Sequence, residues 1–324
     1  PVGAQSATAP EIAAPLTRRR HGHRDPLPTS AASFTMIPMR QVDFAVASAG
    51  VLAAVLSAAL VAPGEPAAGA VSLGQPNDGR LLRGVRLPDR GPGYVSHPAG
   101  RGVDAKYGTE ELVGAITRAA AEVRRVAPGA VLVVGDLSGP EGGRIPGHES
   151  HQAGRDVDLL FYALDGSGAV ARPRAVHFDG EGRATGPDAP PLSFDVRRNW
   201  LVLRALIESP DASLQRVLVS EPLRALLLVH GRAAGEPPWV VERAGDVMCD
   251  TWSPHDNHFH VRFFCSAEDI RHGCRDEHPM YPWRRTELAA RGVLDPVVME
   301  DPHRRAGHAR RWLRSRRAVR QWCP

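Results

Sequence analysis

Residues 147–162 read GHESHQAGRDVDLLFY and end in an apolar run of strand formers. Alternation along a strand places Asp156 and Asp158 on one face and the apolar residues between them on the other. A carboxylate that faces inward needs a cation or several hydrogen-bond donors, because an unpaired buried charge is very costly. His148 and His151 lie shortly upstream and supply metal-binding side chains. This segment therefore indicates a polar site on one face of a packed strand.

A second histidine cluster occurs about a hundred residues later. Residues 253–265 read SPHDNHFHVRFFC. His258 and His260 are two apart in a run of strand formers, so both imidazoles point to the same face. His255 lies just upstream of them. Three histidines within six residues, together with an earlier cluster that carries an inward acid, indicate one shared site.

The residue types favour zinc as the cofactor of this site. Neutral imidazoles suit Zn²⁺, and three protein ligands leave a fourth position open for water. His151, Asp158 and His260 form the most economical ligand set. His258 lies beside the metal on the same face and is expected to act as the general base. Other first-row divalent ions also bind two histidines and an aspartate, so the identity of the metal is an inference.

Helical and strand patterns surround the two clusters without a regular strand–helix–strand repeat. We expect Thr109 and Asp195 to cap the first two helices. A loop rich in Pro and Gly covers residues 166–191. The expected elements are helices at 110–126, 196–208 and 222–230 and strands at 130–135 and 214–220, with two further strands that include residues 156–159 and 258–261. This mixture predicts an α+β fold in which a small, mostly antiparallel sheet carries the zinc site and helices flank it.

The first 70 residues are expected to serve export rather than the fold. Residues 1–35 are a disordered or spurious leader, and residues 36–70 have the basic start, apolar run and small residues of a signal peptide. Cleavage is expected near Ala70. An uncleaved membrane anchor is the alternative, because the apolar run approaches the ~20 residues that span a bilayer. Either way, the folded domain lies outside the cytoplasm.

Three further segments complete the expected domain organisation. Residues 71–106 form an extended N-terminal wrap, residues 107–275 the metal-binding domain, and residues 276–324 a basic C-terminal tail. The net charge of the whole chain is +4. Residues 301–324 contain eight arginines and one acid, which gives this end +7 and leaves −3 on the other 300 residues. The basic character belongs to the tail, so nucleic acid is not an expected partner of the folded domain.

Four cysteines fit an oxidising compartment. They are Cys249, Cys265, Cys274 and Cys323, and none forms a CxxC motif. Cys265 and Cys274 are nine apart across a polar stretch, while Cys249 and Cys265 flank the second histidine cluster. At least one disulfide is expected, with both pairings open.

The motifs resemble those of the penicillin-insensitive murein endopeptidases. That family belongs to a superfamily of zinc peptidases that also holds lysostaphin-type peptidases, D-Ala-D-Ala peptidases and the hedgehog domain. The superfamily pattern is a His followed seven residues later by Asp, and a distant His-x-His. Here the more specific flanks are SHQAGRDVD at 150–158, RNW at 198–200 and HDNHFHVR at 255–262. The resemblance covers roughly residues 107–265.

The resemblance implies roles for individual residues. His151, Asp158 and His260 match the zinc ligands, and His258 matches the partner of the catalytic water. His148 and His255 match further active-site histidines. Asn257 stands where the family usually has Asp or a similar residue, and strand alternation is expected to turn it away from the site.

Two residues beside the ligands have open roles. Asp156 is expected to orient a ligand imidazole or to serve as a turn carboxylate at the strand edge. Arg262 could bind a substrate carboxylate, because its planar fork suits one, or it could pair with an acid of the fold.

The implied reaction is hydrolysis of peptide crosslinks in peptidoglycan. By resemblance, a zinc D,D-endopeptidase in the periplasm would cut the bond from D-alanine to meso-diaminopimelate. One alternative is a D,D-carboxypeptidase or dipeptidase of the same superfamily. The other is a non-catalytic wall-binding module that retains a metal for structure. The partner in each case is peptidoglycan, and the oligomeric state stays open.

Overall fold

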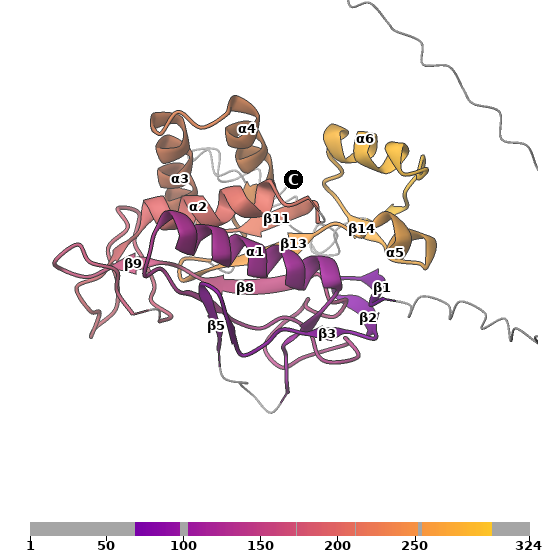
Figure 1. Ribbon diagram of the computed structural model, residues 1–324, viewed down its shortest axis with the longest axis horizontal. Coiled ribbons are helices and arrows are strands. Elements are labelled where there is room, and N and C mark those ends of the chain that lie inside the picture. The colour runs from indigo at the N-terminus through magenta and orange to yellow at the C-terminus, as the bar shows by residue number, and fades with distance from the viewer. Residues whose placement is uncertain (1–68, 98–102, 173, 211, 252–254, 300–324) are drawn as a thin grey trace, which may run out of the picture. The chain divides into compact units, whose positions relative to one another are not determined.

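A seven-stranded mixed sheet forms the centre of the structure, and its two middle strands carry the sequence motifs (Figure 1). The computed structural model describes residues 69–97, 103–172, 174–210, 212–251 and 255–299, all within one unit of the chain that spans residues 62–324. The order across the sheet is β12 (Met248–Cys249), β11 (Leu214–Leu218), β13 (His258–Phe263), β8 (Asp156–Leu160), β7 (Leu132–Val134), β5 (Tyr94–Ser96) and β4 (Arg90–Gly91). The fold is α+β, as predicted.

The sheet contains both parallel and antiparallel pairs, and several neighbouring strands come from segments far apart in the chain. β12 runs parallel to β11 and β5 runs parallel to β7, while every other neighbouring pair is antiparallel. The register of the central pair places His260 opposite Asp158 and Arg262 opposite Asp156. The two sequence motifs are therefore joined by backbone hydrogen bonds.

Four helices share one hydrophobic core with the apolar face of this sheet. They are α1 (Glu110–Val126), α2 (Val196–Ile207), α3 (Glu221–Ala233) and α4 (Pro238–Val247). Figure 1 shows α1 and α2 side by side across β8, β13 and β11. Thr109 caps α1 by accepting the Leu112 N–H, and Asp195 caps α2 by accepting the Arg198 N–H. Both caps were predicted from the sequence, whereas α4 was not.

Alternation along the central strands separates the core from the polar site. Val157, Leu159, Phe259 and Val261 are all at most 2% exposed and belong to the hydrophobic core with α1 and α2. The residues between them carry the carboxylates and imidazoles of the motifs. Because side chains alternate along a strand, these polar groups lie on the face of the sheet that is turned away from α1 and α2.

Residues 71–106, expected as an extended wrap, contain five short strands. β1 (Val71–Gln75) begins where the mature chain was expected to begin, and it forms a hairpin with β2 (Asp78–Leu82). β3 (Val85–Arg86) pairs with β6 (Tyr107–Gly108), while β4 and β5 extend the main sheet. This segment is rich in Gly, Pro and Arg and shows no sustained apolar alternation, which is why the sequence indicated a loop.

Shorter elements complete the structure. They are β9 (Ala163–Leu164), β10 (Ser193–Phe194), α5 (Ala267–Arg271), β14 (Asp276–Glu277), α6 (Pro282–Ala290) and β15 (Val298–Met299). Cys265 and Cys274 form a disulfide with an S–S distance of 2.11 Å, so Cys249 does not pair with Cys265. The residues called leader and most of the signal peptide lie outside the described residues, as do Cys323 and the arginine-rich end. Within the described part of the chain, no helix has the length and apolar character needed to cross a membrane.

Candidate metal centre

Three donor atoms from the predicted ligands meet in a compact triangle. His260 Nδ1 lies 3.1 Å from Asp158 Oδ1, His151 Nε2 lies 3.2 Å from His260 Nδ1, and His151 Nε2 lies 3.4 Å from Asp158 Oδ1. Tetrahedral bonds of about 2.0–2.1 Å to zinc would set the ligand atoms about 3.3–3.4 Å apart. The triangle therefore has the size of one face of a zinc tetrahedron, and these residue types fit the ion.

His151 is held in place by its backbone as well as its ring. It has a φ of 65°, a left-handed conformation that is uncommon outside glycine. Its backbone N–H donates to Asp156 Oδ2 at 3.1 Å, and its Nδ1 lies 2.8 Å from the carbonyl oxygen of Leu137. Since that carbonyl can only accept, Nδ1 carries the hydrogen and Nε2 is the atom available to a metal. Backbone strain of this kind is stored at functional sites.

The protonation states suit a cation. Burial alone would raise the pKa of the Asp158 carboxyl, but the neighbouring histidines outweigh it and hold that pKa well below its usual range. Burial lowers the pKa of His258 and of His260, so both imidazoles are neutral near pH 7. For His151, burial would lower the pKa, but Asp158 outweighs it and the pKa is raised. The raised pKa of His151 shows that the surroundings of Asp158 favour a positive charge at this point.

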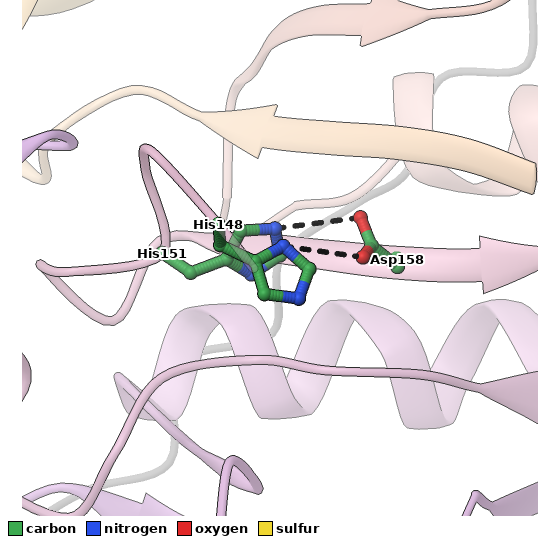
Figure 2. Close-up of side chains that lie close together, drawn as sticks. All are labelled: His148, His151 and Asp158. Carbon is green, nitrogen blue, oxygen red and sulfur yellow. Dashed lines mark ion pairs between the residues drawn. The ribbon is translucent and has the colours of Figure 1, made fainter. Parts of the chain in front are cut away.

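His148 forms a second possible grouping with His151 and Asp158. Figure 2 shows both imidazoles facing the Asp158 carboxylate, with His148 Nδ1 3.8 Å from Oδ2. One ligand atom from each of these three residues lies within 4.8 Å of the others. His148 Nε2 also lies 2.9 Å from Asp136 Oδ2. The triangle with His260 has shorter edges, so the structure offers two candidate ligand sets that share His151 and Asp158.

The other two predicted histidines border the triangle. His258 Nε2 lies 3.6 Å from Asp158 Oδ1, and its ring is about a quarter exposed. His255 has its ring centroid 5.2 Å from that of His258 and 5.9 Å from that of His260. Its Nδ1 lies 3.2 Å from Thr251 Oγ1. The structure thus gathers all five histidines of the sequence motifs around Asp158.

Asp156 and Arg262 form a buried ion pair on the same face. Arg262 donates from Nε to Asp156 Oδ1 at 2.8 Å and from Nη2 to Oδ2 at 3.1 Å. Its Nη1 donates to Glu277 Oε2 at 2.7 Å, and its side chain is 8% exposed. Burial would raise the pKa of Asp156, but Arg262 and the nearby histidines lower it far below its usual range. The guanidinium therefore contacts two acids of the fold.

The strand pattern predicted that Asn257 turns away from the site, and this prediction was wrong. Its Oδ1 lies 2.5 Å from His258 Nδ1. The reason is that β13 begins at His258, so Asn257 occupies a bend before the strand and does not follow its alternation. The sequence also missed Asp136 and the carbonyl of Leu137, which contact His148 and His151 from a loop without a motif of its own. It missed His177 as well, which contacts Asp256 and Asn257 from another loop.

The fold and this cluster define an α+β domain with a candidate metal site, built from two central strands and the loop before β8. Comparison with known proteins identifies its family. The family model for penicillin-insensitive murein endopeptidase matches residues 72–289, and the chain belongs to this family. The match includes both the strands of residues 71–106 and α6, beyond the limits that the motifs indicated.

Named relatives agree with the family match. The chain is 28% identical over 242 residues to a penicillin-insensitive murein endopeptidase of Klebsiella pneumoniae, which covers 73% of this chain and 80% of that protein. It is 26% identical over 240 residues to the protein of the same name from Haemophilus influenzae, covering 70% and 77%. A Pectobacterium atrosepticum protein with this name is 27% identical over 178 residues, covering 54% and 58%. The family relationship supports a peptidase that acts on murein.

Proposed function

We propose that this protein is a zinc-dependent D,D-endopeptidase that hydrolyses the D-alanyl to meso-diaminopimelate crosslinks of peptidoglycan. The observation that carries the proposal is the triangle of His151 Nε2, Asp158 Oδ1 and His260 Nδ1, with edges of 3.1–3.4 Å. Membership of the murein endopeptidase family supports the substrate.

The residues present would hold the metal and leave one side of it for substrate. His151, Asp158 and His260 are the proposed ligands, in keeping with the tetrahedral preference of zinc. When bound, Zn²⁺ lowers the pKa of a water molecule toward ~7 and polarises a scissile carbonyl. Asp156 and Arg262 are proposed to position the ligands. Asp156 accepts the backbone N–H of His151, and Arg262 donates to Asp156.

His258 is the proposed general base. Its Nδ1 faces Asn257 Oδ1, which can only accept, so the lone pair resides on Nε2. That atom lies on the side of Asp158, 3.6 Å from Oδ1, and can take a proton from a water that attacks a substrate carbonyl. His148 and His255 border this position and are proposed to contact substrate or the water.

We also propose a periplasmic location for the domain. The signal-peptide pattern of residues 36–70 and a wall polymer as substrate both support export. The disulfide between Cys265 and Cys274 fits an oxidising compartment.

The test is digestion of purified crosslinked peptidoglycan by the chain from Val71 onward, with the muropeptides resolved by mass. We expect dimers to be converted to monomers, and we expect chelator or a His260→Ala variant to abolish the conversion. His272→Ala is the matched control, because His272 is half exposed and contacts Glu268 on α5. Loss of terminal alanine with dimers intact would show a carboxypeptidase instead. An unchanged profile with binding to the wall would show a binding module.

A further inference from the structure

We propose that His177 is a positioning residue that acts through Asn257 to hold the proposed base, His258, in one tautomer. This inference rests on the proposed function of His258. His177 lies on the loop between β9 and β10, far in sequence from both histidine motifs. A series of side-chain contacts connects it to the proposed metal ligands and supports this role.

Two of the contacts in the chain are short hydrogen bonds. His177 Nδ1 lies 2.6 Å from Asp256 Oδ1, and His177 Nε2 lies 3.3 Å from Asn257 Nδ2. On its other side, Asn257 Oδ1 lies 2.5 Å from His258 Nδ1. His258 Nε2 then faces Asp158 Oδ1 at 3.6 Å. Four consecutive side chains thus connect an exposed loop to the edge of the candidate metal centre.

The order of donors and acceptors follows from the groups themselves. The Asp256 carboxylate can only accept, so His177 Nδ1 carries a hydrogen and donates it. The amide nitrogen of Asn257 can only donate, so His177 Nε2 accepts its N–H. That contact orients the amide so that its oxygen faces His258, which must donate from Nδ1. The lone pair of His258 is thereby left on Nε2, the atom nearest Asp158.

An amide at position 257 is the group that this order requires. It donates at one end to His177 Nε2 and accepts at the other end from His258 Nδ1. An aspartate there would accept at both ends and could not donate to His177 Nε2. Asn257 therefore transmits the orientation of His177 to His258 in this chain.

The loop is built to present His177 at this point. Val176 and Phe178 on either side of it are 6% and 4% exposed, whereas the His177 side chain is 59% exposed. The Phe178 ring packs against those of Phe161 and Phe194, with centroids 6.2 Å and 5.8 Å away. The Phe178 N–H donates to the Asp256 carbonyl at 2.9 Å. The backbone is thus anchored to the core and to Asp256, which leaves the exposed ring of His177 to contact Asp256 and Asn257.

The first test measures the tautomer directly and needs no catalysis. The full chain is labelled with ¹⁵N-histidine, and its nitrogen spectra are recorded with zinc removed and with zinc bound. Signals of His258 are assigned by their loss in His258→Gln. We expect the Nδ1–H form of His258 in the unaltered chain and a mixture with the Nε2–H form in His177→Leu. His177→Gln should keep the Nδ1–H form, because its amide can accept from Asn257 and donate to Asp256. An unchanged tautomer in His177→Leu would overturn the proposal.

The second test separates kcat from KM on a crosslinked muropeptide dimer. We expect His177→Leu to lower kcat ~10-fold with little change in KM, since a positioned base contributes 10²–10⁴-fold and only part of this is lost. His177→Gln should restore most of kcat. His272→Leu, with a side chain 51% exposed, is the control and should have no effect. Equal loss in both His177 variants would contradict the proposal. If the unaltered chain cuts no dimer, the proposed function fails, while the tautomer measurement still decides the role of His177.

Discussion

The backbone N–H of His151 donates to Asp156 Oδ2 at 3.1 Å, which couples a proposed metal ligand to an ion pair of the core. Asp156 accepts two more hydrogen bonds from Arg262, which in turn contacts Glu277. The left-handed backbone of His151 is sustained by this network, since such strain persists only where the surroundings determine it. Stability and ligand geometry therefore depend on the same buried charges.

Arg262→Met should destabilise the protein strongly, because it leaves two buried carboxylates without their cation. Removing one partner of a buried ion pair costs about 3–5 kcal/mol. The free energy of unfolding is measured by urea denaturation of the metal-free chain. Arg125→Met is the control, since Arg125 pairs with Glu122 on the surface with a side chain 71% exposed, and pairs of this kind contribute little to stability. Similar losses in the two variants would show that burial of the Arg262 pair has no special effect.

Asp156 should make stability depend on pH in the acid range. Its pKa in the folded protein lies far below the ordinary value of 3.8, despite burial, because Arg262 and the histidines favour the carboxylate. A lowered pKa of an acid contributes stability that is present above the unfolded pKa and is lost as pH falls toward the folded one. The gap in unfolding free energy between the unaltered chain and Asp156→Asn should therefore be largest near pH 7 and smaller at pH 3. Urea denaturation of the metal-free proteins measures this gap, and a constant gap would contradict the assignment.

Zinc should raise the melting temperature through His260 rather than His148. A ligand at a hundred times its dissociation constant stabilises the folded state by about 2.7 kcal/mol. We therefore expect zinc to raise the melting temperature of the unaltered chain and to leave that of His260→Ala unchanged. Zinc should still raise the melting temperature of His148→Ala. Its affinity for zinc should lie within about tenfold of that of the unaltered chain, because His148 lies beside the proposed ligands. If His148→Ala abolishes the shift and His260→Ala keeps it, the alternative grouping in Figure 2 is the metal site.

Local pattern sufficed for the parts of the fold with clear periodicity. The predicted helix at 110–126 and its Thr109 cap match α1, because a 3.6-residue apolar period and a capping hydroxyl are both visible in the chain. Alternation also placed Asp156 with Asp158, and His258 with His260, on one face of their strands, and the pairing of the two strands then sets His260 opposite Asp158. The prediction failed for Asn257 because a strand boundary cannot be located to one residue from its pattern.

Contacts made by loops could not be predicted in this way. Glu277, which follows the disulfide-bonded loop between Cys265 and Cys274, accepts a hydrogen bond from Arg262. The Leu137 carbonyl that contacts His151 is a backbone group, and no sequence motif marks it. His177 is a single histidine in a segment rich in Pro and Gly. Only the three-dimensional course of that loop, fixed by the burial of Phe178, brings its ring to Asn257.

Gly231 and Gly245 should respond oppositely to replacement by alanine. Both lie within helices, Gly231 in α3 and Gly245 in α4. A Cβ on Gly231 would lie 2.5 Å from the ring of Trp200, a core residue that is 1% exposed, whereas a Cβ on Gly245 would meet nothing within 4 Å. Gly231→Ala should therefore lower the free energy of unfolding by about 1–3 kcal/mol through overpacking.

Gly245→Ala should raise the free energy of unfolding by up to about 1 kcal/mol, because alanine loses less backbone entropy than glycine in a helix. Urea denaturation of both variants measures the two changes against the unaltered chain. Stabilisation by Gly231→Ala would mean that the Trp200 ring can move aside without loss, and the close packing of α3 on α2 would then not require a glycine.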